Sequence, residues 1–140
     1  MDIENDLLKL FYEFIMANSS FASVLQIVPK TPQSFSKFPT IVFKESGNVD
    51  YTSGKTLNRQ EYIDRLTYTV EIYSKDVIIG NTKYLSNIVI KELNHLIYKF
   101  FNNLGFNRIT SNRGEYIDLS VDRHISIFEG KINNWNGKII

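Results

Sequence analysis

The stretch RLTYTVEIYSK, residues 65–75, alternates apolar and polar side chains with the period of two that is typical of a β-strand. One face of such a strand carries the apolar residues Leu66, Tyr68, Val70 and Ile72, and the other carries Thr67, Thr69, Glu71 and Tyr73. The pattern predicts a strand that packs against a core on its first face. Its second face is expected to meet solvent or a partner.

On the N-terminal side, residues 3–16 have the spacing of an amphipathic helix, with Asp2 available as its N-cap and with an apolar face made of Leu7, Leu8, Phe11, Phe14 and Ile15. Three prolines interrupt residues 18–39, so this region is predicted to be an extended connector whose apolar residues reach the core. TIVFKE, residues 40–45, is a short strand. A long polar loop, residues 45–62, is expected between the two strands.

On the C-terminal side, apolar residues recur every three or four positions between Thr82 and Leu104 and predict a long helix that Gly105 ends. Three strand-like runs follow: FNRITS (106–111), YIDLSV (116–121) and RHISIFEGKI (123–132). Short connections between them favour hairpins.

The resulting order, α-β-β-α-β-β, predicts an α+β fold in which a mainly antiparallel sheet of four or five strands packs against two amphipathic helices. A length of 140 residues fits a single domain spanning 1–140. We find no internal repeat or low-complexity segment in it.

The composition excludes several classes of protein. A formal net charge of +1 gives no electrostatic signature of a nucleic-acid-binding protein, and without cysteine there are no disulfides and no thiolate sites. The N-terminus MDIENDLL lacks the features of a signal peptide, and no stretch is apolar enough for a membrane span. We therefore expect a soluble protein made inside a cell, without sequence-specific nucleic-acid binding and without a membrane.

The polar loop contains Ser53-Gly54-Lys55-Thr56, which matches the end of a nucleotide-binding P-loop. The leading glycine of that motif would fall at position 49, which is Val49, and Gly47 is two residues too far away. The segment after Thr56 runs directly into the alternating strand and leaves no room for the helix that a P-loop requires. A solvated loop between strands is the better interpretation.

Other motifs of catalysis are equally weak. His95 and His124 have no histidine or cysteine at metal-ligand spacing, and we interpret them as a surface helix residue and a partly exposed strand residue. The carboxylates are scattered, and no G-x-S-x-G elbow occurs. We therefore predict no enzyme and assign no catalytic, cofactor-binding or metal-binding residue.

The layout resembles the small tail-terminator and tail-completion proteins of long-tailed bacteriophages and phage-tail-like particles. The resemblance rests on the N-terminal helix, FPTIVFKESGN, the polar loop, RLTYTVEIYSKD, the helix ending in LGFNRITSNRG, and DRHISIFEGKI. It covers nearly the whole chain in order and lengths, and it carries no catalytic motif.

The resemblance implies a structural virion protein of the tail or neck, assembled in the bacterial cytoplasm. Its subunits would form a homo-oligomeric ring, commonly a hexamer, that caps the head-proximal end of the tail tube, ends tube polymerisation and presents a surface for head joining. The implied partners are the tail tube protein, a head-completion or neck protein and, where the tail contracts, a sheath protein. The candidate contact residues are Tyr51, Lys55, Arg59, Thr67, Thr69, Glu71, Tyr73 and Trp135.

Two alternatives remain open. A head-completion or neck connector protein has subunits of similar size and related fold. A small-molecule-binding or enzymatic α+β domain is a more distant alternative, and it would require a concave polar pocket in which titratable groups converge.

Overall fold

The computed structural model describes residues 3–33, 35, 37–50, 63–114, 120–133 and 138–139. The helices are α1 (Ile3–Asn18) and α3 (Ser86–Asn103). The strands are β1 (Gln26–Val28), β2 (Thr40–Asp50), β3 (Ile63–Ser74), β4 (Val77–Ile79), β5 (Thr82–Tyr84), β6 (Asn107–Gly114), β7 (Asp122–Asn133) and β8 (Lys138–Ile139).

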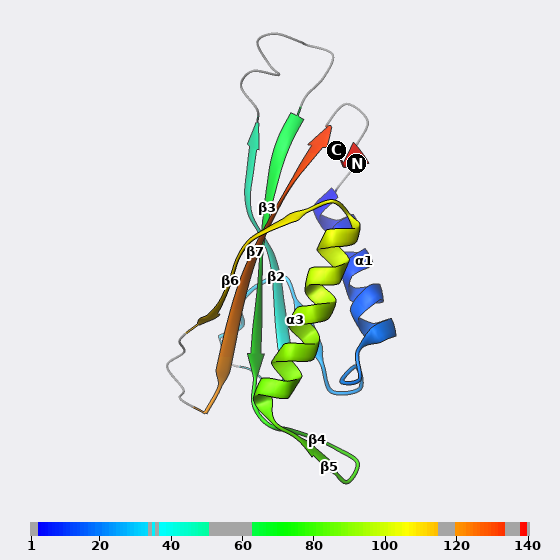
Figure 1. Cartoon of the computed structure of the whole chain (residues 1–140), viewed down its shortest axis with the longest axis vertical. Helices are drawn as coiled ribbons and strands as arrows, with labels where there is room; N and C mark the ends of the chain where they lie inside the picture. The colour runs from blue at the N-terminus through cyan, green and yellow to red at the C-terminus, as the bar shows by residue number, and fades with distance from the viewer. Residues whose placement is uncertain are drawn as a thin grey trace.

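Within the described residues, six strands form one sheet in the order β1-β2-β3-β7-β6, and β8 pairs with the end of β7. The long strand β3 pairs antiparallel with β2 on one side and with β7 on the other, and these three strands form the centre of the sheet. The short strand β1 pairs with β2 in parallel, so the sheet is mixed. Figure 1 shows an elongated molecule in which α3 crosses the sheet with α1 beside it, and the β4–β5 hairpin projects from one end.

The main core lies between the sheet and the two helices. The first face of β3 supplies Leu66, Tyr68, Val70 and Ile72, as its alternation predicts. Phe101 of α3 is fully buried at the centre of this core, stacked on Phe128 of β7 with 4.2 Å between ring centroids. Phe11 of α1 stacks on Phe43 of β2 at 4.6 Å and brings the first helix onto the same face.

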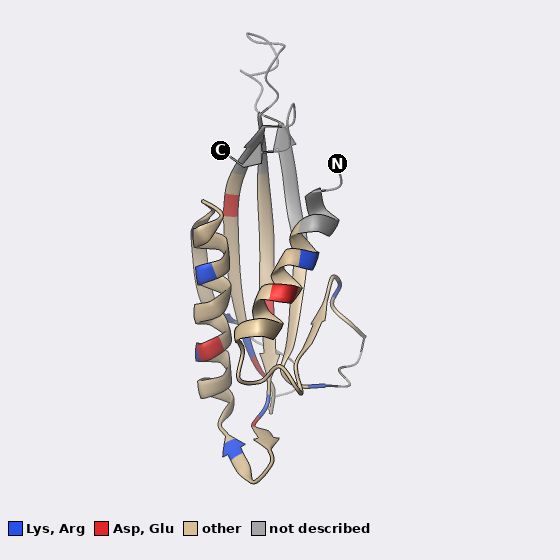
Figure 2. Ribbon diagram, turned by 90° about the vertical axis from the view of Figure 1, so that its right-hand side faces the viewer, with Lys and Arg blue, Asp and Glu red and all other residues tan. Residues whose placement is uncertain are grey.

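A second, smaller core lies on the other face of the sheet. It contains Val42, Tyr73 and Val121, with Val28, Phe35 and Phe38 packed against them. The chain between β1 and β2 therefore crosses behind the sheet, on the side away from the helices, where Figure 2 shows it. We call the described part of this segment, residues 28–33, 35 and 37–38, the strap.

The end of α3 confirms the role predicted for Gly105. Gly105 has a φ of 86°, in the left-handed region that glycine adopts most easily. Its N–H donates to the carbonyl of Asn102, and the N–H of Phe106 donates to the carbonyl of Phe101 at 2.9 Å. These two bonds form a Schellman motif, and the rings of Phe101 and Phe106 are in contact beside it.

The predicted α+β class and both helices are confirmed, but the strand order is richer than α-β-β-α-β-β. Strands β1, β4, β5 and β8 were not predicted, and β5 occupies residues that were assigned to the start of the long helix. The strand pair β2–β3 also continues through Asp50 and Asp64, so the polar loop begins later than residue 45. Asp2 and most of the run 116–121 lie outside the described residues.

Among the described residues, no helix combines the length and the apolar composition needed to cross a bilayer.

Candidate functional site

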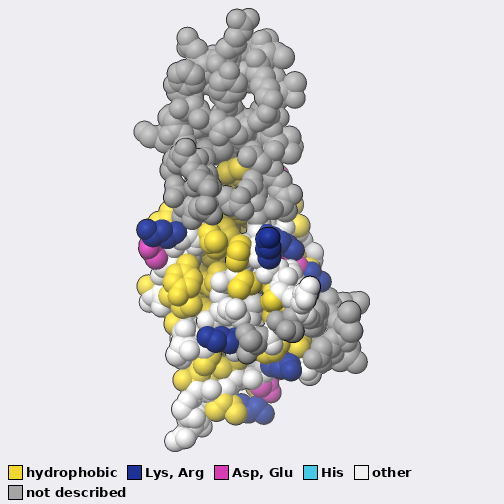
Figure 3. Space-filling view, turned by 180° about the vertical axis from the view of Figure 1, so that it is seen from behind, with side chains coloured by type: hydrophobic (Ala, Val, Ile, Leu, Met, Phe, Trp, Pro, Cys, Tyr) yellow, Lys and Arg dark blue, Asp and Glu magenta, His cyan; other side chains and the backbone are white. Residues whose placement is uncertain are grey.

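The sheet face away from the helices is the first candidate site, because it carries four of the predicted contact residues. Part of it is uncovered, and we call this part the open face: Lys44, Thr67, Thr69, Thr110, Asn112, Ile125, Ile127 and Glu129, all of them half-buried or exposed. Register places Thr69 opposite Ile127 and Thr67 opposite Glu129. In Figure 3, hydrophobic side chains gather across the middle of this side, with Lys and Arg side chains around them.

The other two predicted contact residues on this face, Glu71 and Tyr73, are not exposed. They are only 3% and 2% accessible, because the strap covers the part of the face where they lie. The Tyr73 ring packs against Phe35 with 4.6 Å between centroids. The expectation that both residues meet solvent or a neighbouring chain is therefore wrong, since alternation gives the face of a strand and not what covers that face.

Glu71 is the centre of a buried ionic cluster. Arg123 of β7 donates to one carboxylate oxygen of Glu71. The other oxygen lies 3.4 Å from the Lys44 ammonium and accepts from the Tyr73 hydroxyl at 3.3 Å and from Thr31 of the strap at 3.5 Å. The cluster thus connects β2, β3, β7 and the strap through one side chain.

The pKa of Glu71 reflects two opposing effects. Burial alone would raise it, but the hydrogen bond and charge of Arg123, together with Lys44, outweigh burial and hold the pKa below its ordinary value. Burial and the adjacent carboxylate raise the pKa of the Tyr73 phenol. Glu71 is therefore a structural anion, already neutralised by its own chain.

Four further predicted contact residues, Tyr51, Lys55, Arg59 and Trp135, lie outside the described residues. Their contact role stays a prediction. The Ser53-Gly54-Lys55-Thr56 sequence lies there as well.

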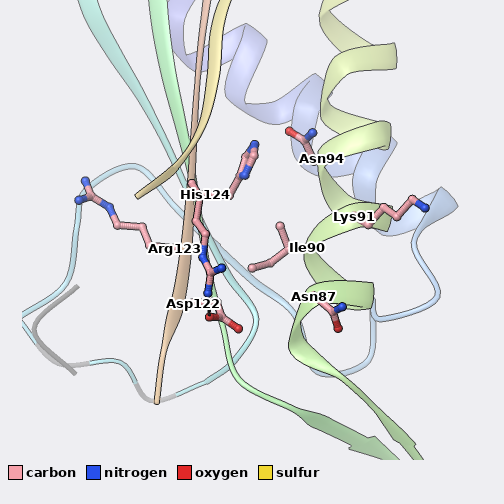
Figure 4. A pocket seen from close by; sticks show the side chains of 8 residues that line it. Asn87, Ile90, Lys91, Asn94, Asp122, Arg123 and His124 are labelled. Atoms are coloured by element: carbon pink, nitrogen blue, oxygen red, sulfur yellow. Dashed lines mark hydrogen bonds and ion pairs between the residues drawn. The ribbon is translucent and has the colours of Figure 1, made fainter. Parts of the chain in front are cut away.

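A pocket between α3 and the β6–β7 strands is the second candidate site. It has a volume of about 330 Å³ and is lined by Asn87, Ile90, Lys91 and Asn94 of α3, by Arg113 of β6, and by Asp122, Arg123 and His124 of β7. Figure 4 shows Ile90 pointing from the helix toward β7, while the ammonium end of Lys91 points away from that strand. The Arg113 guanidinium donates to Asp122 at 3.1 Å on one wall.

A chain of hydrogen bonds fixes the inner wall of this pocket. Ser126, which is buried, donates to the Asn94 carboxamide oxygen at 3.2 Å. Ser111 of β6 lies 3.2 Å from the Ser126 hydroxyl and 2.8 Å from Nε2 of His124. The single hydroxyl proton of Ser126 is used in the bond to Asn94, so the Ser126 oxygen accepts the hydroxyl proton of Ser111. The Ser111 oxygen then accepts from Nε2–H of His124.

Protonation of His124 is disfavoured in the fold. Burial lowers its pKa, and the positive charge of Arg108 lowers it further. The neutral ring with its proton on Nε2 leaves Nδ1 as a hydrogen-bond acceptor.

The pocket was not predicted from the sequence, although one signal for it exists. His124 shares its strand face with Ser126 and with the fully buried Phe128, so alternation alone could have placed the imidazole on the helix side. No local pattern links Asn94 or Ser111 to that face. His95 is exposed, as expected, and within the described part of the chain no cluster of His, Cys, Asp and Glu could hold a metal ion.

A comparison with models of known protein families finds none that matches this chain, and a comparison with curated protein sequences likewise finds no match.

Proposed function

We propose that this protein is a structural subunit of a phage tail or phage-tail-like particle, where it forms the ring that terminates the tail tube. The observation that carries the proposal is the open face, on which threonine and isoleucine side chains of neighbouring strands stand side by side. Such a face, β-branched and only partly polar, suits burial against a second copy of the chain.

The shape of the subunit supports the same proposal. The paired strands β2 and β3 run past the helices at one end of the long axis, and the β4–β5 hairpin projects at the other (Figure 1). A terminator needs two different ends, because one must match the last ring of tube protein and the other must not propagate the stack. We assign these ends to the tail tube protein and to the head-completion or neck protein, with a sheath protein as a further neighbour in contractile tails.

Deletion of the gene, followed by electron microscopy of the particles, tests this function. Tails of uncontrolled excess length that fail to join heads are the expected result. Tails of normal length beside heads that leak DNA would move the assignment to the neck connector. Normal particles would contradict both structural functions.

Complementation of the deletion tests the open face itself. Ile127→Lys places a charge in the middle of the proposed subunit contact and is expected to abolish rescue, because a buried unpaired ammonium costs several kcal/mol. The matched control is Ile88→Lys, which adds the same charge at an exposed isoleucine of α3 and is expected to rescue normally. Circular dichroism and urea denaturation check that both variants fold. Rescue by a folded Ile127→Lys protein would exclude the open face from the assembly.

A further inference from the structure

We propose that the pocket between α3 and the β6–β7 strands is a binding site for a carboxylate group carried on a short aliphatic stem. The inference goes beyond the proposed assembly function and does not depend on it. Its observations are the cavity, the side chains that line it and the balance of charge around it.

The first observation is a surplus of positive charge. Arg123 is neutralised by Glu71, and Arg113 is paired with Asp122. Lys91 has no ion-pair partner in the described part of the chain, and its stem lines the cavity. Among the described residues, one cation beside the cavity is therefore left without a counter-charge, which matches a ligand with a single negative charge. The carboxylate of Asp122 would repel a dianion such as phosphate.

The second observation is the orientation of the polar groups. Because the Asn94 carboxamide oxygen is held by Ser126, its NH₂ group is left to donate elsewhere. Asp122 takes one N–H of the Arg113 guanidinium and leaves others available. The Asn94 and Arg113 donors lie on opposite walls and can hold the two oxygens of a carboxylate. The Lys91 ammonium, which points away from β7, reaches that carboxylate by rotation of its flexible stem.

The third observation is the apolar part of the cavity. Ile90 points from α3 toward β7 between the polar walls (Figure 4). A volume of about 330 Å³ is at the lower end of small-ligand pockets and fits a carboxylate with a stem of a few methylenes. Free short-chain acids and glutamate side chains of a partner protein share this chemistry.

The two histidines of the chain provide the test. His124 lines the pocket, whereas His95 is exposed on α3 and does not line it. The charged groups around His124 are Lys91 of α3, Arg108 and Arg113 of β6, and Asp122 and Arg123 of β7. An anion bound among them stabilises the imidazolium, so binding is expected to raise the pKa of His124. The resonance of His95, which lies outside the pocket, serves as the internal reference.

The experiment follows both imidazole resonances of the full-length protein by NMR as a function of pH, in sodium butyrate and in sodium chloride of equal ionic strength. We expect butyrate to shift only the titration of His124, together with saturable shifts of the amides of residues 87–94 and 122–126. In Lys91→Met the butyrate midpoint should rise about 5- to 10-fold, since one charge-assisted contact is lost. The matched control, Lys99→Met, removes an exposed lysine of the same helix that does not line the pocket.

Further ligands distinguish the source of the carboxylate. Tighter binding of a blocked Gly-Glu-Gly peptide than of butyrate assigns the pocket to an acidic side chain of a protein partner, and the reverse order assigns it to a free acid. The matched Gly-Gln-Gly peptide should not bind. Equal shifts of His95 and His124, equal midpoints in the two lysine variants, or tighter binding of inorganic phosphate than of butyrate would each overturn the proposal.

Discussion

At the scale of single residues, close packing against a neighbouring ring explains why position 130 of β7 is a glycine. A Cβ atom at this position would lie 2.8 Å from three ring atoms of Phe106, which is itself only 3% exposed. Phe106 is held from the other side by Phe101 and by the Schellman motif, so its ring has little room to move. Here the glycine is required by a contact across the core and not by its backbone angles.

We therefore expect Gly130→Ala to destabilise the fold by about 1–3 kcal/mol, because overpacking forces the Phe106 ring out of its place. Urea denaturation followed by circular dichroism measures the free energy of unfolding. In a Phe106→Ala background the same change should be neutral or slightly stabilising, since alanine suits a strand better than glycine. An equal cost in both backgrounds would show that the contact with Phe106 is not the cause.

At the scale of elements, α3 depends on residues distant in sequence at its start and on local ones at its end. Its N-cap residue, Leu85, makes no side-chain capping bond. Asp76, between β3 and β4, instead accepts from the N–H of Ser86 at 2.8 Å, so the β4–β5 hairpin brings a remote cap to the helix. A carboxylate there also interacts favourably with the helix dipole. Gly105 closes the other end with bonds that need only neighbouring residues.

Asp76→Ala is expected to lower the free energy of unfolding by about 1 kcal/mol, as loss of an N-cap acceptor does. Asp76→Asn keeps an acceptor oxygen and should therefore lower the free energy of unfolding by less than Asp76→Ala does. The control is Lys83→Met, which removes the exposed ion pair of Asp76, 3.6 Å long, and leaves the cap in place. The free energy of unfolding of Lys83→Met should stay within about 0.5 kcal/mol of that of the wild type. A larger loss in Lys83→Met than in Asp76→Ala would assign the effect to the ion pair.

At the scale of the whole molecule, the Glu71 cluster joins the strap to the back of the sheet and makes stability depend on pH. Because the pKa of Glu71 is lower in the fold than in the unfolded chain, its contribution is fully present above about pH 4.3 and is lost as the pH falls further. The lowered pKa of His124 also makes the fold less stable as the pH falls, but in a higher pH range than Glu71 does. Its contribution is present above about pH 6.5 and declines below it.

Glu71→Gln is expected to destabilise the protein by about 3 kcal/mol at pH 7, because it leaves the buried side of Arg123 without its counter-charge. The difference from the wild type should shrink as the pH falls below about 4.3, because the stabilisation from ionised Glu71 is then progressively lost. Thermal unfolding between pH 3 and 8 gives both curves. Parallel curves for the two proteins would show that Glu71 does not titrate with unfolding. The wild type is expected to lose stability between pH 6.5 and 5, and Glu71→Gln should show the same loss, because protonation of His124 causes it.

The amino-acid sequence by itself determined the parts of this protein that depend on neighbours along the chain. Apolar spacing predicted α1 and most of α3, alternation predicted β3 and its inward face, and Gly105 predicted the helix end. Each of these follows from the geometry of one element, because a period of 3.6 or 2 decides which side chains share a side.

Only the tertiary structure decided what covers each of those sides. The strap buries Glu71 and Tyr73 and leaves Thr67 and Thr69 half-buried on the same strand face, although the four residues are equivalent in the alternating pattern. The parallel pairing of β1, the remote cap from Asp76 and the convergence of Asn94, Arg113 and His124 on one pocket likewise join segments far apart in the sequence. Periodicity records which way a side chain faces, whereas burial depends on which distant segment folds over it.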